Sequence, residues 1–117
     1  MDSILTSIKL MLGIPAEYVH FDGAIIAQIN SAFFTLWQNG VGPSTCFKIT
    51  SDEQMWEEFL GDSDDYEMVK TYVYEKVKMN FDPPTSSFVM DAMKRQSDEE
   101  LWRLNIQAEM EAMNDGN

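Results

Sequence analysis

Two consecutive prolines, Pro83 and Pro84, constrain the fold of this sequence more than any other feature. Proline lacks the amide donor that a helix interior needs, and it disfavours helical backbone angles in the residue before it. Apolar residues recur at intervals of three and four on both sides of the pair, as they do along one face of a helix. The sequence therefore predicts a helix from about residue 64 to the prolines, and another from residue 85 or 86 to about 110. The buried stripe predicted for the first of these helices is Val69, Tyr72 or Val73, and Val77.

The first half of the chain carries two more amphipathic stretches. Residues 3–12 place aliphatic side chains on one face, and Gly13 and Pro15 end that pattern. Asp22 is a predicted N-cap, and the residues after it show the clearest helical periodicity in the chain, which stops at Asn39-Gly40. The apolar positions of this second helix are Ile25, Ile26, Ile29, Phe33, Leu36 and Trp37.

The middle of the chain is predicted to be less regular. Cys46–Ile49 is a candidate for a short extended piece. Thr50 and Glu53 match a capping box, in which each side chain satisfies the backbone amide of the other residue, so a short helix is predicted to follow as far as Gly61. The fold class predicted by all these segments is mainly α. It is a small bundle of about four to five helices with a long C-terminal helix and a short extended or loop insertion.

The length and composition fit one domain. The chain has 117 residues, of which 44% are hydrophobic, and this is enough for a single core. We expect residues 1–112 to form that single helical domain. We expect residues 113–117 to form a disordered tail, because the last residues of a domain are poorly ordered unless other contacts hold them.

Acidic residues dominate the charge of the chain. Twenty Asp and Glu against eight Lys and Arg give a net charge of −12. This charge argues against nucleic-acid binding, which depends on Lys and Arg at phosphates, and against anionic membranes. No apolar stretch approaches the roughly 18 residues that cross a bilayer, and the first residues lack the pattern of a signal peptide. We expect a soluble protein that is made in the cytoplasm and does not bind membranes.

Residues suited to catalysis or metal binding are scarce. The only histidine, His20, and the only cysteine, Cys46, are far apart in the sequence, whereas zinc sites and activated nucleophiles need clustered groups. A calcium-binding loop that starts at Asp62 fails, because Glu67 and Val73 stand where Gly and Glu are required. We therefore expect no enzymatic activity, no cofactor and no bound metal.

The charged second half of the last predicted helix contains large apolar residues that spread around its circumference. One core cannot cover all of them, and Trp and Arg are common anchors of protein interfaces. Contact with another chain and packing of the last turns on the chain's own core are both compatible with this pattern. The candidate interface residues are Leu101, Trp102, Arg103, Leu104 and Ile106.

Residues 72–87 (YVYEKVKMNFDPPTSS), residues 100–105 (ELWRLN) and residues 4–9 and 12–15 (ILTSIK and LGIP) carry a family resemblance. With them, the chain resembles the head–tail connector, or adaptor, proteins of long-tailed double-stranded-DNA bacteriophages and related prophages. The likeness runs over nearly the whole chain and is weakest from about Val41 to Asp65. Its motifs are structural: a helix ended by Asp-Pro-Pro, and a long final helix.

The resemblance implies a helical subunit that forms a ring, typically of twelve copies, under the portal protein of the filled capsid. The ring would extend the DNA channel and offer a docking surface for the next neck or tail-completion protein. Asp82, Pro83 and Pro84 would act as a hinge that sets the angle between the two long helices. The final helix would lie along a neighbouring subunit or the portal. Such a protein would be made in the bacterial cytoplasm and reside in the virion at the head–tail junction.

Under this resemblance, the acidic surplus would let DNA pass through the ring without binding to it. The alternative function is that of a small acidic binding or inhibitory protein, of phage or bacterial origin, that mimics the charge of DNA. A mimic needs acids at near-phosphate spacing across one face. Here the acids cluster in residues 52–67 and near the C-terminus, with lysines between them, which favours the connector. The candidate channel-facing acids are Asp52, Glu53, Glu57, Glu58, Asp62, Asp64 and Asp65.

Overall fold

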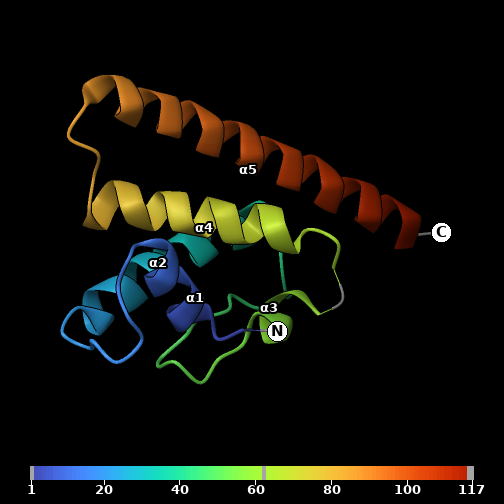
Figure 1. Ribbon diagram of the computed structural model, residues 1–117. Helices are drawn as coiled ribbons and strands as arrows, with labels where there is room; N and C mark the ends of the chain where they lie inside the picture. The colour runs from blue at the N-terminus through green and yellow to red at the C-terminus, as the bar shows by residue number, and fades with distance from the viewer. Residues whose placement is uncertain (1, 62, 116–117) are drawn as a thin grey trace.

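The computed structural model describes residues 2–61 and 63–115, and this part of the chain is built from helices. In chain order these are α1 (Ile4–Met11), α2 (Asp22–Gln38), α3 (Trp56–Leu60), α4 (Tyr66–Phe81) and α5 (Ser87–Asp115) (Figure 1). The described residues contain no strand, and the only β-type backbone pairing among them is an isolated antiparallel bridge between Ser3 and Met55. The predicted fold class is therefore confirmed: a mainly α bundle with a long C-terminal helix and a loop insertion.

The α1 helix is short and firmly anchored. The Ser3 hydroxyl caps it by accepting a hydrogen bond from the Thr6 amide at 3.3 Å. The buried Lys9 side chain donates a hydrogen bond to the carbonyl oxygen of Ala16 at 2.9 Å, and its ammonium lies 2.8 Å from the Asp22 carboxylate. Lys9 thus ties α1 to the loop that follows it and to the start of α2.

The start of α2 differs from the sequence prediction. Asp22 is the first residue of the helix and Phe21 precedes it as the cap, without a side-chain hydrogen bond to the helix end. The prediction of Asp22 as N-cap is therefore wrong by one position. The pairing with Lys9 holds the Asp22 carboxylate instead, in the first turn, where the helix dipole favours a negative charge.

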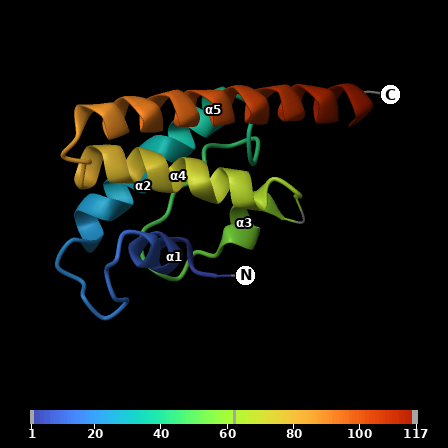
Figure 2. The ribbon, with the colours of Figure 1, turned by 45° about the horizontal axis from the view of Figure 1, so that its top comes forward.

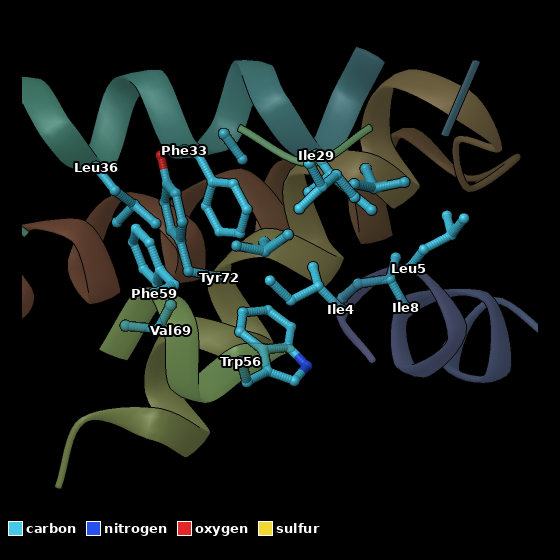
Figure 3. Packing of buried hydrophobic residues seen from close by; sticks show 14 of the residues in the cluster. Ile4, Leu5, Ile8, Ile29, Phe33, Leu36, Trp56, Phe59, Val69 and Tyr72 are labelled. Carbon is cyan, nitrogen blue, oxygen red and sulfur yellow. The ribbon is translucent and has the colours of Figure 1, made fainter. Parts of the chain in front are cut away.

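The core lies between α1, α2, α3 and α4, with Leu104 added from α5, and α2 crosses α4 at its centre (Figure 2). The Phe33 ring stacks on the Phe59 ring at 4.5 Å between centroids and meets the Trp56 indole edge-on at 6.1 Å (Figure 3). The buried Trp56 nitrogen donates a hydrogen bond to the Ser7 hydroxyl at 2.7 Å. These contacts explain why the short helix α3 is stable in its place, since its aromatic side chains fill the centre of the fold. The predicted stripe of α4 is also in this core, with Val69, Tyr72, Val73 and Val77 buried.

The insertion between α2 and α3 is a loop held by side chains. Asn30 on α2 binds the backbone of Ile49 twice, accepting from its amide at 2.8 Å and donating to its carbonyl at 3.0 Å. The Thr50 hydroxyl accepts a hydrogen bond from Gln54, not from the backbone of a helix. The predicted capping box of Thr50 and Glu53 is therefore wrong. The helix starts later, where the Glu58 carboxylate accepts a hydrogen bond from the Met55 amide.

The two long helices α4 and α5 run antiparallel, and residues 82–86 connect them (Figure 1). The α5 helix is the longer by far, and its C-terminal end projects past the start of α4 (Figure 2). Residues 113–115, which the sequence predicted to lie in a disordered tail, continue α5, since no proline or glycine interrupts the helix before Gly116. Residues 116–117 lie outside the described residues.

Candidate assembly interface

The predicted hinge residues Asp82, Pro83 and Pro84 follow α4 directly. Asp82 ends the helix with φ of −142° and ψ of 69°, which are not helical angles. Its carboxylate accepts a hydrogen bond from the Lys78 ammonium at 2.8 Å, so the last turn of α4 is pinned to the residue before the prolines. The chain then reverses direction and α5 starts at Ser87, with the Ser86 hydroxyl accepting a hydrogen bond from the Val89 amide at 3.4 Å. These residues lie in the connection between the two long helices.

The inner side of α5 packs on the rest of the chain. Leu104 is fully buried in the core, and Leu101 and Ala108 pack against the same core from one turn on either side. The Asn105 amide donates a hydrogen bond to the carbonyl oxygen of Asn39 at 3.0 Å, which fixes α5 to the end of α2. Leu104 is thus enclosed within its own chain, and the surface available to a partner has to be made by other residues.

The opposite side of α5 exposes large apolar side chains. Trp102 is 63% exposed, and Phe88 near the start of the helix is 77% exposed. We call this surface the outer stripe; it consists of Phe88, Trp102, Ile106, Met110 and Met113. At a rotation of about 100° per residue, these five side chains lie within roughly 80° of one another around the helix axis, on the side away from Ser97 and Leu104.

Charged residues divide the outer stripe. Arg95 and Glu99 lie between its two apolar ends and on the same side of the helix. The Arg103 guanidinium binds the Glu99 carboxylate at 2.7 Å, and both side chains are more than half exposed. An exposed pair of this kind adds little to the stability of the free chain, so both groups can change partners when another protein binds.

The structure gives the five predicted interface residues three different degrees of exposure. Trp102 and Arg103 are exposed, Leu101 and Ile106 are partly buried, and Leu104 is in the core. Sequence reasoning missed Phe88, Met110 and Met113 as parts of the same surface. A helical projection over the whole of α5 would have found them, because each lies an approximate whole number of turns from Trp102.

The candidate channel acids gather around α3. Asp52, Glu53, Glu57, Glu58 and Asp64 are exposed on this helix and the segments beside it, whereas Asp62 lies outside the described residues. Asp65 turns toward α5: burial and the nearby charge of Glu111 raise the pKa of its carboxyl group above the usual range. Asp65 and Glu111 also line a groove of about 450 Å³ between the end of α3, residues 40–43 and α5.

The residues considered for catalysis or metal binding lie apart in the structure. His20 lies exposed in the loop before α2, with its ring 4.8 Å from the Phe21 ring, and Cys46 is a partly buried free thiol in the insertion. Within residues 2–61 and 63–115, no three His, Cys, Asp or Glu side chains come together in a way that could hold a metal ion. Within the same residues, no helix has the length and apolarity required to cross a membrane.

The chain matches a protein-family model. The family model described as phage connector protein matches residues 4–111. Neither the curated proteins nor the solved structures gave a match. The matched range includes α1 to α4, residues 82–84 and all of the outer stripe except Met113. Because this match covers nearly the entire sequence, the chain belongs to the phage connector protein family.

Proposed function

We propose that this protein is a structural subunit that forms a ring between the portal protein and the next neck or tail-completion protein of a long-tailed phage. The ring extends the channel through which DNA leaves the capsid. Membership of the connector family supports a role in joining phage head and tail components. The protein acts through its surfaces, without catalysis.

The observation that carries this proposal is the outer stripe of α5. A folded monomer rarely presents a row of large apolar side chains on a rigid helix unless another protein covers them. Trp102 lies in the middle of α5 beside Arg103, and these two residue types dominate the energetics of protein interfaces. We assign the outer stripe to contact with the portal or with the neighbouring subunit, with Trp102 and Arg103 as anchors.

The distribution of charge supports a contact in which one surface of a subunit binds a different surface of the next subunit. The segment around α3 is rich in acids, whereas α4 carries three lysines against two glutamates. A contact between unlike surfaces of identical subunits closes into a ring when the rotation between them divides the circle evenly. We propose that twelve copies close in this way and that the acids around α3 face the channel, where they repel the DNA backbone.

Electron microscopy of negatively stained particles tests this proposal. The protein is imaged alone and after mixing with the portal protein encoded in the same genome. We expect ring-shaped particles, formed alone or only on the portal, with an additional layer of density under the portal ring. Monomers that leave the portal images unchanged would contradict the proposal and would direct attention to the DNA-mimic alternative.

A further inference from the structure

Two acidic side chains face each other inside the joint between α4 and α5. Glu75 on α4 is only 4% exposed, and the charge of Glu100 on α5 acts on its carboxyl group. The ion pairs seen among the described residues join Lys9 to Asp22, Lys78 to Asp82 and Arg103 to Glu99, and none includes Glu75 or Glu100. This acid pair therefore has no basic partner in the described part of the chain.

The geometry requires a proton between the two acids. As ionised groups, both are acceptors only, and Oε2 of Glu75 and Oε1 of Glu100 then lack any hydrogen-bond donor. The other oxygen of Glu100 accepts a hydrogen bond from Gln96 at 3.5 Å. Two negative charges beside each other, with these oxygens buried, cannot both persist, and a single shared proton satisfies both orphaned oxygens.

The surroundings of the pair do not neutralise it. On α4, burial raises the pKa of Tyr72 to about 12, with the charges of Asp98 and Glu100 adding to the effect, so this phenol stays neutral. On α5, Asp98 and Glu99 bring further negative charge, and Arg103 is bound to Glu99.

Lys76 and Lys94 line a separate hollow together with Asp98. From α1, Met11 lines the hollow beside Glu75, whereas Lys9 is bound to Asp22.

Burial is also the main reason for the titration behaviour of the two groups. It raises the pKa of Glu75 to about 8, with a further contribution from the charge of Glu100 and the hydrogen bond between the two. Burial likewise raises the pKa of Glu100. The pair therefore keeps one proton near neutral pH.

The two halves of α5 are held differently. The second half has Leu104 in the core and the Asn105 hydrogen bond to Asn39. In the first half, Ser97 is the only buried residue, and Phe88 and Val89 are exposed. The contact of residues 87–100 with the rest of the chain thus depends more heavily on the joint that contains the acid pair.

We propose that Glu75 and Glu100 form a proton-dependent latch that holds the first half of α5 against α4. When the proton leaves, the two carboxylates repel each other and residues 87–100 detach, while the second half of α5 stays in place. The latch does not depend on the assembly of the protein into a ring.

The sign of the effect follows from linkage. The folded chain holds the proton up to a higher pH than the unfolded chain, in which a glutamate loses it near its ordinary pKa. The contribution to stability therefore falls as the pH rises from the ordinary range of glutamate to about 8, and it changes little above that. Local opening of residues 87–100 should follow the same course.

Hydrogen–deuterium exchange of the full chain tests the latch at pH 6 and pH 8, with each rate corrected for the intrinsic pH dependence of exchange. We expect the protection of residues 87–100 to drop on the order of tenfold or more between the two values, and that of residues 101–112 to change less. In Glu75→Gln the amide can donate to Glu100 and cannot ionise, so the pH dependence of protection should become much smaller. Glu99→Gln, which removes an exposed acid from the same helix, should keep the pH dependence.

Equal protection at both pH values in the unaltered chain would overturn the proposal, and so would a pH dependence that is undiminished in Glu75→Gln. A second measurement covers the case in which that variant does not fold. Carbon-13 NMR of the Glu75 and Glu100 carboxyl groups in the unaltered chain should show a midpoint well above pH 6 for one of the two. Midpoints in the ordinary range of glutamate, near pH 4–5, for both groups would also overturn the latch.

Discussion

Gly42 occupies a position in the turn after α2 that no other residue could take without rearrangement. Its φ angle of 95° lies in the region that L-residues with a side chain rarely adopt. A Cβ atom placed there would come within 2.5 Å of the Phe59 ring, which is stacked on Phe33 in the core. This turn therefore sets how closely the insertion approaches α3.

Substitution of Gly42 should destabilise the fold more than substitution of a comparable glycine elsewhere. Gly13 has a similar φ of 82°, but a Cβ atom there would meet nothing within 4 Å. Both Gly13→Ala and Gly42→Ala carry the cost of the backbone angle, and only Gly42→Ala adds the clash with Phe59. We expect Gly42→Ala to lower the free energy of unfolding by about 1–3 kcal/mol more than Gly13→Ala does, measured by urea denaturation. Equal losses would show that the ring of Phe59 moves aside at no cost.

At the scale of elements, α5 combines an inner side that completes the core with an outer side that exposes Trp102. Because Trp102 makes few contacts with its own chain, Trp102→Ala should leave the thermal midpoint of unfolding nearly unchanged. If Trp102 anchors the contact with the portal or a neighbour, the same change should weaken assembly by roughly 30-fold or more. Sedimentation velocity across a concentration series, with and without the portal protein, measures this loss.

Phe34 offers a matched control for Trp102. It is an aromatic residue on α2 that is 46% exposed, so it has comparable exposure on a different helix. We expect Phe34→Ala to assemble like the unaltered protein. If Phe34→Ala and Trp102→Ala impaired assembly equally, the assignment of the contact to the outer stripe would have to be abandoned.

The sequence predicted the helices well because their apolar spacing is a local signal. The buried stripe of α4 and the ends of α1 follow from periodicity, glycine and proline alone. The start of α3 was missed because Thr50 and Glu53 imitate a capping box. In the structure, Gln54 binds the Thr50 hydroxyl and the backbone amides of Thr50 and Ser51 instead.

Features that depend on how two helices meet could not be predicted in this way. Glu75 reads as one of several charged residues on α4, and its burial appears only when the antiparallel register places Glu100 opposite it. The exposure of Trp102 and the burial of Leu104, two residues later, likewise depend on which side of α5 meets the core. The sequence limited the candidate interface to one helix, and the packing selected its outer stripe.

At the scale of the whole molecule, the proposal that the acids around α3 line the channel makes a kinetic prediction. Replacing Glu53, Glu57 and Asp64 with their amides removes three exposed acids from this region. If they face the channel, the channel wall of the variant repels the DNA backbone less, so the passing DNA can bind to the wall. DNA ejection from assembled phage should therefore slow, and more so at low salt.

A variant with three exposed acids neutralised elsewhere provides the comparison for this experiment. Asp2→Asn, Glu17→Gln and Asp91→Asn change the net charge by the same amount on other parts of the surface. Ejection kinetics, followed by the fluorescence of a DNA-binding dye, should remain normal in this control. If the two triple variants behave alike, the acids around α3 have no special role in the channel.

The central claim is that many copies of this chain add to the portal as one ring. Native mass spectrometry of the portal protein, alone and with an excess of this chain, tests it most directly. We predict that the mass of the portal complex increases by twelve times the mass of one chain, which is 13.4 kDa. A portal complex whose mass stays unchanged would contradict the account.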